Sequence, residues 1–511
     1  MYIKKTDFDH EGKSTFEKRL VSISEQAGIF FLGKLAFHFI TFFTGIMLAR
    51  ILGATLLGQY ILGLVTIQAL TNFTKMGFDQ GLVRFIPIFN LDSMGKTKRV
   101  IQNNILISLI LSTTLALILY LFSNFIARAL FHSPAMAQVL KIFSFYLPVF
   151  GLFSLGAAVL RGFKRADIQS HIQNIITPII LIILLSILVL LGGNLTGVIM
   201  ARLFSHLVSI GFIVYFLLRN FSEVFKHAPV PYDFKRYLSF SSPLLLIGLL
   251  YFFIGHVDLL MLGYFLDSDQ VGIYSVAVRI AMLNIFGLQA VNMIFAPNIS
   301  ELSEIGDMGS LAKLLKVLTK WVFYFSLFLF AFVIIFRIEI LKLFGTSFVL
   351  GSTALVILAG GQLLNAFAGP TGTILIMAGK QKWEILNSIG MLILNVILNL
   401  ILIPKFAIEG AAIATATSIS VINLFKLVET YMEFGFHPYD FKYFKGILAI
   451  MAGTLVALIF HGISTLNFVF TLVFGGMVIS VTTLAAYYFL KFDEEELVIL
   501  RKIALKINFQ H

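Results

Sequence analysis

Cysteine, charge and long polar stretches are scarce in this chain of 511 residues. It has no cysteine, which excludes disulfides, haem thiolates and iron–sulfur ligation. Only 13% of its residues are charged and 59% are hydrophobic, whereas soluble domains have about 25% and about 45–50%. A soluble core could not hide that surplus, because a soluble domain needs a polar surface of similar extent. The composition therefore predicts an integral membrane protein.

Other absences exclude most catalytic functions. The sequence has no nucleotide-binding loop of the G-x-x-x-x-G-K-[ST] kind, no metal-ligand spacing among its histidines and no extramembrane loop long enough to form a domain. The first 26 residues carry mixed charges and no short apolar core of a cleavable signal peptide. We expect no enzyme activity, no catalytic residue, no metal, no cofactor and no nucleic-acid partner.

Long apolar stretches dominate what is present. A membrane helix needs roughly 20 apolar residues to cross the hydrocarbon layer. We predict an all-α integral membrane protein with transmembrane helices at 27–49, 54–77, 101–123, 139–160, 172–191, 196–218, 240–263, 272–296, 321–343, 352–377, 383–403, 408–431, 446–463 and 467–489.

The distribution of Lys and Arg predicts the orientation. Most of the 38 basic residues fall on one side of the membrane if the helices alternate in direction from the first one. Because cytoplasmic loops carry the excess of Lys and Arg, both termini are predicted to be cytoplasmic, in a multi-pass protein of the cell membrane. The net charge of +12 is then mainly a topology signal, with attraction to anionic lipid heads.

An internal repeat divides the chain. LGATLLGQY (52–60) ends in Gly58-x-Tyr60, and LGYFLDSDQVGIY (262–274) ends in Gly272-x-Tyr274; LRGFKRADIQ (160–169) and MAGKQKWEIL (377–386) match at nearly the same offset. Six helices per repeat predict two parallel lobes, with a substrate path between them. The predicted segments are a cytoplasmic N-terminus (1–26), an N-lobe (27–218), a cytoplasmic linker (219–239), a C-lobe (240–431), an appendage of two helices (446–489) and a cytoplasmic tail (490–511).

Among the charged residues inside predicted spans, four are the candidates for a cargo site: Lys34, Arg202, Asp258 and Arg279. Such residues face a bundle interior or a wet cavity, because a charge in hydrocarbon is costly. Three are basic, which suits an anionic cargo such as a phosphate or pyrophosphate head.

Structural interpretations of the same residues remain open. Asp258 and Arg279 could form an ion pair, since they lie at similar depth in adjacent helices; Lys34 could snorkel to the interface, and Arg202 is near its helix start. Arg50 and Arg84, at helix ends, are secondary candidates for the cargo site, with interfacial anchoring as the alternative.

Several stretches together resemble the polysaccharide or O-antigen flippase family. They are LARILGATLLGQYILG (48–63), GLVRFIP (81–87), DLLMLGYF (258–265), VGIYSVAVRI (271–280) and GPTGTILIMAGKQKWEILNSIGMLILNVILNLILIPKFAIEGAAIATA (369–416). That family belongs to the superfamily that also holds the multidrug-extruding MATE transporters and the peptidoglycan lipid flippases. The resemblance extends from about residue 27 to 490.

The resemblance implies a V-shaped cavity between two six-helix lobes and a cargo of oligosaccharide on a polyprenyl (pyro)phosphate. The cargo would be turned from the cytoplasmic to the outer leaflet by alternating access. By position within the lobes it implies that Lys34, Arg202 and Arg279 meet the phosphate, with Asp258 beside them, and that helices 446–463 and 467–489 form a groove for the lipid tail.

Two other functions are weighed against the flippase. A cation-coupled drug extruder of the same fold would need acidic residues deep in a lobe, and Asp258 is the one acidic residue clearly inside a predicted span. A polytopic glycosyltransferase or polymerase would need a sizeable external loop, and turns such as LGGNLTG (191–197) are too short. Expected partners are the lipid-linked oligosaccharide, membrane lipids and glycosyltransferases or a polymerase of the same pathway, with the protein itself a monomer.

Overall fold

A computed structural model describes residues 5–441 and 443–490, with side chains from residue 38 onward except Ile294. Its described residues form helices and turns, without a strand. Eleven helices in this part are long and apolar enough to cross a membrane. The predicted all-α membrane class is confirmed, and the count of fourteen spans stays a prediction.

The chain divides into two units, which we describe separately. The N-terminal unit comprises Phe37–Ser275 and Asn399–Ala411. The C-terminal unit comprises Val276–Leu398, the described residues from Ala412, and the first part of α1 up to Ala36. The boundaries of the two predicted lobes remain predictions.

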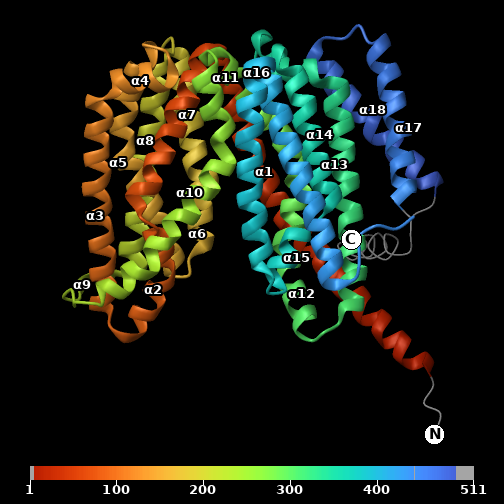
Figure 1. Cartoon of the computed structure of the whole chain (residues 1–511), viewed down its shortest axis with the longest axis horizontal. Helices are drawn as coiled ribbons and strands as arrows, with labels where there is room; N and C mark the ends of the chain where they lie inside the picture. The colour runs from red at the N-terminus through yellow and green to blue at the C-terminus, as the bar shows by residue number, and fades with distance from the viewer. Residues whose placement is uncertain (1–4, 442, 491–511) are drawn as a thin grey trace, which may run out of the picture. The chain divides into compact units, whose positions relative to one another are not determined.

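The N-terminal unit contains most of the first ten helices (Figure 1). They are α1 (Lys5–Lys75), α2 (Phe78–Asp92), α3 (Met94–Leu121), α4 (Ser123–Phe131), α5 (Ala135–Gly162), α6 (Ala166–His171), the π-helical turn η1 (Ile172–Ile176), α7 (Thr177–Leu190), α8 (Leu195–Asn220), α9 (Ser222–Lys226) and α10 (Phe234–Phe265), followed by the start of α11 (Ser268–Ala281). Its core joins α2, α3, α5, α8 and α10 around Phe78, Leu82, Phe85 and Tyr237.

The C-terminal unit contains the later helices. They are the end of α11, the 3₁₀ turn η2 (Met282–Ile285), α12 (Phe286–Glu304), α13 (Met308–Phe344), the 3₁₀ turn η3 (Thr346–Gly351), α14 (Ser352–Ala368), α15 (Thr371–Met377), α16 (Gln381–Phe434), α17 (Tyr443–Ile463) and α18 (Phe468–Phe489). Helices α17 and α18 lie side by side, and both contact α13 (Figure 1).

Two long helices break where the sequence predicts a turn between spans. In α1 the break is at Gly53 (φ 66°, ψ −177°), and in α16 it is at Ala407 (φ 49°, ψ −128°). The two halves of α16 are joined by hydrogen bonds from Asn387 Nδ2 to Glu429 Oε2 (2.6 Å) and from Lys426 Nζ to Glu384 Oε1 (2.7 Å). Helix α16 is therefore an antiparallel pair of helices.

The two motif glycines of the repeat contact each other's helix within the N-terminal unit. A Cβ on Gly58 would lie 1.6 Å from the carbonyl oxygen of Ser268, and a Cβ on Gly272 would lie 2.1 Å from that of Ala54. Small residues allow such close approach of membrane helices. The contact gives a physical reason for both glycines of the Gly-x-Tyr pattern.

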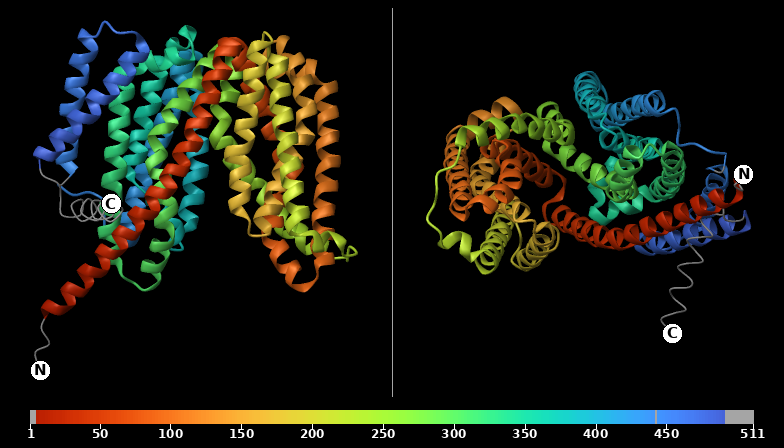
Figure 2. Two further views of the ribbon diagram at one scale, coloured as in Figure 1. Left: turned by 180° about the vertical axis from the view of Figure 1, so that it is seen from behind. Right: turned by 90° about the horizontal axis from the view of Figure 1, so that it is seen from below.

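The linker between the predicted lobes is anchored to α3. Lys98 Nζ donates hydrogen bonds to the carbonyl oxygens of Phe225 (2.7 Å) and His227 (3.0 Å), and the amide of Val230 donates to Gly95 (3.1 Å). The segment follows the edge of the N-terminal unit in the view from below (Figure 2).

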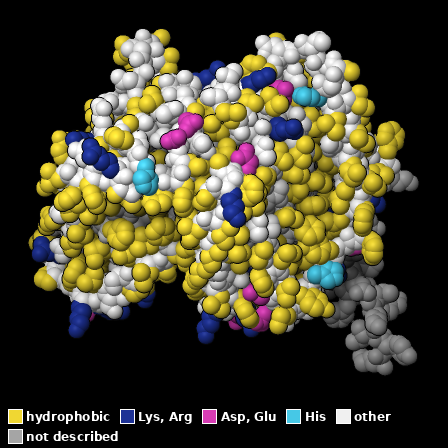
Figure 3. Space-filling view, turned by 45° about the horizontal axis from the view of Figure 1, so that its top comes forward, with side chains coloured by type: hydrophobic (Ala, Val, Ile, Leu, Met, Phe, Trp, Pro, Cys, Tyr) yellow, Lys and Arg dark blue, Asp and Glu magenta, His cyan; other side chains and the backbone are white. Residues whose placement is uncertain are grey.

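Large hydrophobic side chains cover much of the outer surface. Leu106 and Leu117 on α3 and Ile183 on α7 are more than half exposed. In Figure 3 the visible face is mainly hydrophobic, with charged side chains scattered over it. An exposed apolar surface of this extent is what a helix bundle presents to lipid, and the chain is a multi-pass membrane protein.

Candidate functional site

The candidate site lies where the end of α1 and the start of α2 meet α10. Gly77 connects α1 to α2 with a left-handed conformation (φ 72°), and a Cβ there would lie 2.1 Å from the carbonyl oxygen of Ser241 on α10. A Cβ on Gly81 would lie 2.3 Å from Ser241 Oγ. Only glycine fits this contact, so the two glycines hold the three helices in a tight corner.

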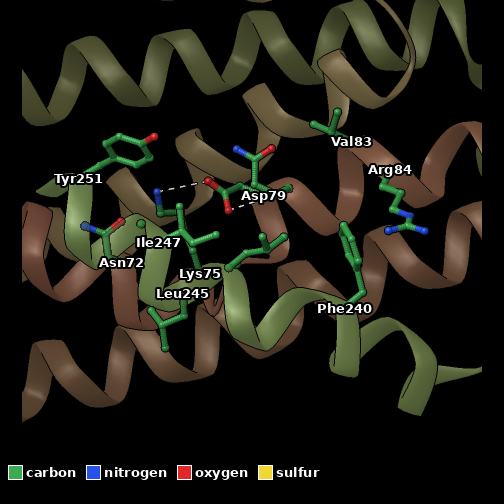
Figure 4. Close-up of a pocket in the computed structure, with 13 residues that line it drawn as sticks. Asn72, Lys75, Asp79, Val83, Arg84, Phe240, Leu245, Ile247 and Tyr251 are labelled. Atoms are coloured by element: carbon green, nitrogen blue, oxygen red, sulfur yellow. Dashed lines mark hydrogen bonds and ion pairs between the residues drawn. The ribbon is translucent and has the colours of Figure 1, made fainter. Parts of the chain in front are cut away.

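A cavity of about 430 Å³ opens beside this corner, within the N-terminal unit (Figure 4). One wall comes from α1 and α2 and is largely polar, and the other comes from α10 and is largely apolar. The lining residues are Asn72, Lys75, Gly77, Asp79, Gln80, Val83, Arg84, Phe240, Leu244, Leu245, Ile247, Gly248 and Tyr251. The volume is typical of a small-ligand site.

The charged groups of the cavity are two cations and one carboxylate. Lys75 Nζ, at the end of α1, lies 3.5 Å from Asp79 Oδ2, at the start of α2, and the two form a loose ion pair across the corner. The guanidinium carbon of Arg84 lies 4.1 Å from the centre of the Phe240 ring, a cation–π contact. Within the described part of the chain, no carboxylate pairs with Arg84. The lining therefore carries an excess of one positive charge, and it leaves guanidinium donors for an anion.

Arg202 lies in a second polar cluster of the same unit. Its Nη1 donates a hydrogen bond to the hydroxyl of Tyr60 (3.0 Å), which is 1% exposed, and its Nε is buried without a hydrogen-bond partner. His206 Nδ1 lies 3.0 Å from the carbonyl oxygen of Arg202, so Nδ1 carries the proton and Nε2 can accept from Tyr146 (3.3 Å). Among the described residues, the polar partners of this guanidinium are neutral.

Asp258 ties α10 to two other segments of the N-terminal unit. It accepts hydrogen bonds from the hydroxyl of Tyr274 (3.1 Å) at the start of α11 and from Asn399 Nδ2 (2.8 Å) in α16. Arg279 lies farther along α11, partly buried, in the C-terminal unit. The ion pair between Asp258 and Arg279 stays a prediction.

The other two predicted cargo residues lie near the start of the chain. The side chain of Lys34 falls outside the described residues. Arg50 is exposed on α1, three residues before the Gly53 break. Among the described residues, no group of three or more His, Asp or Glu side chains could hold a metal ion.

An apolar groove lies in the C-terminal unit between α13, α17 and α18. It has a volume of about 350 Å³ and is lined by Tyr324, Phe325, Phe328, Gly446, Ile450, Ser480, Thr483, Leu484 and Tyr487. A Cβ on Gly446 would lie 2.2 Å from the ring of Tyr324, whose hydroxyl donates to the carbonyl oxygen of Tyr443 (3.1 Å). These contacts hold the start of α17 against α13.

Comparison with models of known protein families shows to which family the chain belongs. The model of a family described as polysaccharide biosynthesis protein matches residues 23–303, more than half of the chain. The chain belongs to this family. In this polysaccharide biosynthesis protein, residues 243–401 also match the model of the MatE family. The resemblance seen in the sequence is confirmed.

Individual relatives agree with the family. A curated protein of Haloferax volcanii, named probable low-salt glycan biosynthesis flippase Agl15, is 27% identical over 267 residues, which are 52% of this chain. The matched region spans about half of that relative, 55% of its length.

Solved structures share the fold of this polysaccharide biosynthesis protein. The lipid II flippase MurJ in an inward closed conformation covers 89% of this chain and 99% of its own, with 16% identity and a TM-score of 0.66. An inward-facing multidrug resistance MATE family transporter of the MOP superfamily covers 78% and 94%, with 19% identity and a TM-score of 0.64. At these identities the likeness concerns the fold.

The sequence singled out Arg84 as a secondary candidate for the cargo site and did not single out Lys75 or Asp79, which line the same cavity. Both lie in FTKMGFDQ (73–80), at the cytoplasmic end of the predicted span 54–77 and just beyond it, where charge is ordinary. The signal that could have singled them out is the glycine between a Lys and an Asp four residues apart. It predicts a sharp corner with both charges on the same side.

Proposed function

We propose that this protein flips an oligosaccharide linked to a polyprenyl (pyro)phosphate from the cytoplasmic to the outer leaflet of the cell membrane. It would act by alternating access, as a transporter without enzyme activity, with both termini in the cytoplasm. The observation that carries the proposal is the cavity with excess positive charge at the α1–α2 corner. The distribution of Lys and Arg predicts that this corner faces the cytoplasm, where such a cargo would enter.

Arg84 is the proposed first contact of the phosphate. A guanidinium presents its donors in a planar fork that matches phosphate oxygens. The cation–π contact with Phe240, 4.1 Å from the guanidinium carbon to the ring centre, positions this group and occupies none of its N–H donors with a carboxylate. Lys75, loosely paired at 3.5 Å, can turn from Asp79 to a phosphate without losing a strong contact.

Arg202 is the proposed cation for a later stage. It lies within two turns of the N-terminal end of α8, which the predicted orientation places in the outer half of the membrane. Its unpartnered Nε and its neutral neighbours leave its charge for the cargo. Lys34 and Arg279 keep the phosphate-binding role predicted for them, with Asp258 as the neighbouring carboxylate, and Arg50 remains a secondary candidate.

The groove between α13, α17 and α18 is the proposed site for the prenyl tail. It is lined by aromatic and aliphatic side chains with little polarity. The curated flippase relative and the MurJ-like fold support a lipid-linked cargo. The likeness to a MATE transporter supports the alternative of a cation-coupled drug extruder. The positive excess of the cavity disfavours a cationic drug.

The test uses proteoliposomes with a fluorescent short-chain lipid-linked oligosaccharide. Protection of the probe from an external quencher reports flipping. Arg84→Gln is expected to lower the rate by about 10-fold or more, because hydrogen bonds to charged groups contribute about 1.5–3 kcal/mol. Arg219→Gln is the matched control, since Arg219 is exposed at the end of α8 and bonds only Tyr215 among the described residues.

Two outcomes would contradict the proposal. One is a wild-type flipping rate for Arg84→Gln at equal protein content. The other is wild-type protein that leaves the lipid-linked probe in place and expels a cationic dye instead, which would favour the extruder.

A further inference from the structure

The cavity holds a carboxylate that a pure phosphate site would not contain. Asp79 accepts a hydrogen bond from the amide of Gln80 (3.1 Å) and lies 3.5 Å from Lys75 Nζ. A charge-assisted contact of full strength is shorter, about 2.7–2.9 Å. The carboxylate is thus fixed by backbone and loosely held by Lys75, and its repulsion weakens binding of an anion alone.

A carboxylate in an anion-binding cavity is explained if the ligand also carries sugar hydroxyl groups. A carboxylate offers two oxygens with about four acceptor positions and no donor. Adjacent hydroxyls of a pyranose are donors at a spacing that such a pair of oxygens can accept together. A cargo with both a phosphate and hydroxyls would use the cations and Asp79 at the same time.

The wall of the cavity that α10 forms has an aromatic side chain that can pack against a sugar ring. Tyr251 lines the cavity, is 63% exposed, and its hydroxyl has no hydrogen-bond partner in the part of the chain that the structure describes (Figure 4). One face of a pyranose ring presents C–H groups, which pack on an aromatic ring, while its hydroxyls stay at the edge. A tyrosine suits this contact, because its ring is apolar and its tip is polar.

Asn72 adds a further acceptor. Its Nδ2 donates to the carbonyl oxygen of Gln68 (3.0 Å), which fixes the amide and leaves Oδ1 on the side of the cavity. On the facing helix, a Cβ at Gly248 would lie 3.6 Å from this oxygen. The absence of a side chain at Gly248 keeps the approach to Asn72 open.

We propose that this cavity binds the junction between the phosphate of the cargo and its first sugar. Arg84 takes the phosphate, Tyr251 carries the sugar ring, and Asp79 and Asn72 accept its hydroxyl groups. The cavity volume of about 430 Å³ has room for more than a phosphate. This inference rests on the proposed function, and it makes Asp79 and Tyr251 specificity-determining residues.

The test measures binding to the full-length protein in detergent by calorimetry. The two probes are a short-chain prenyl phosphate and the same lipid carrying one hexose. The wild type is expected to bind the hexose probe at least about 10-fold more tightly, because sites built for hydroxyl groups discriminate strongly against analogues without them.

The variants separate the two parts of the site. Tyr251→Ala and Asp79→Asn are each expected to bring the two affinities to within about 2-fold, and Asp79→Asn to bind the bare phosphate probe more tightly, because repulsion is removed. Tyr251→Phe keeps the ring and should keep most of the preference. Arg84→Gln should weaken both probes in equal proportion. Tyr431→Ala, at a tyrosine of similar exposure (56%) on α16, is the control.

The possible outcomes separate a failure of sugar recognition from a failure of the proposed flippase function. Equal wild-type affinity for the two probes, or an unchanged preference in both Tyr251→Ala and Asp79→Asn, would overturn sugar recognition and leave phosphate recognition standing. If neither probe binds the wild type, the proposed use of this cavity fails, and the inference fails with it.

Discussion

Basic residues in two regions, the polar clusters around Arg84 and Arg202 in the N-terminal unit and the α16 pair in the C-terminal unit, have different partners. In the N-terminal unit, Arg84 rests on an aromatic ring and Arg202 bonds a tyrosine hydroxyl. In the α16 pair of the C-terminal unit, Lys426 reaches Glu384 at 2.7 Å and Lys380 reaches Glu433 at 2.6 Å. A cation whose partners are neutral can still attract an anionic ligand. A cation in a close ion pair is already neutralised by its partner and stabilises the fold instead. The difference separates candidate binding residues from structural ones without reference to any family.

The contrast also predicts opposite effects on stability. A partly buried charge without a counter-charge destabilises the fold that contains it. Removing one member of a buried pair destabilises the fold instead, because the remaining member is left unpaired. Neutral substitutions of the basic residues in these two regions should therefore shift the midpoint of thermal unfolding in opposite directions.

Of the further substitutions that test this comparison, Arg202→Met has the largest expected effect. We expect Arg202→Met to lower flipping by about 10-fold or more, because it removes the donors offered to the phosphate. It should also raise the midpoint of thermal unfolding in detergent, since a costly charge is gone. Flipping in proteoliposomes and a melting curve on the same preparation measure both.

A control separates charge from contact at this position. Tyr60→Phe removes the acceptor of the Arg202 bond and keeps the ring. It should lower flipping less than Arg202→Met does. A lower unfolding midpoint in Arg202→Met, with flipping at the wild-type rate, would mean that this arginine is structural, and that it does not differ from the cations of the α16 pair.

Sequence reasoning captured what depends on composition and failed on what depends on distant contacts. Runs of apolar residues predicted the membrane helices, and Arg202 stood out because it interrupts one. Its partner Tyr60 lies 142 positions away, and Asn399 lies 141 positions from Asp258. Neither partner is unusual in its own helix, so hydropathy alone gives no reason to single it out.

The cavity at the α1–α2 corner was not predicted from the sequence, for a different reason. Its charge lies at a helix end, where Lys and Asp are common, and its shape depends on how closely α10 approaches Gly77 and Gly81. Glycine contacts of this kind become visible only when the facing backbone is known. Arg84 was predicted to lie at a helix end, which is wrong: it lies inside α2 (Phe78–Asp92), where it contacts the Phe240 ring and lines the cavity. Interfacial anchoring remains the alternative to a cargo role.

A smaller effect is expected at the Lys426–Glu384 pair. Lys426→Met should lower the free energy of unfolding by about 1–3 kcal/mol, below the usual value for a fully buried pair because both side chains keep some exposure. Glu384 Oε2 is already buried without a partner, so loss of Lys426 Nζ would leave this carboxylate still less satisfied. The double variant Lys426→Met with Glu384→Met should recover wild-type stability. If the double variant stays less stable than the wild type, the two side chains contribute to stability by more than mutual charge neutralisation.

The smallest effect is expected at the Lys380–Glu433 pair. The Lys380 side chain is 45% exposed, and exposed ion pairs contribute less than about 1 kcal/mol. Glu433 also accepts a hydrogen bond from Trp383 Nε1 (2.9 Å), which remains when the lysine is removed. Lys380→Met should therefore shift the unfolding midpoint by less than Lys426→Met and leave flipping unchanged. A clear loss of flipping at wild-type stability would mean that a closely paired cation takes part in transport, and close pairing would no longer identify a structural residue.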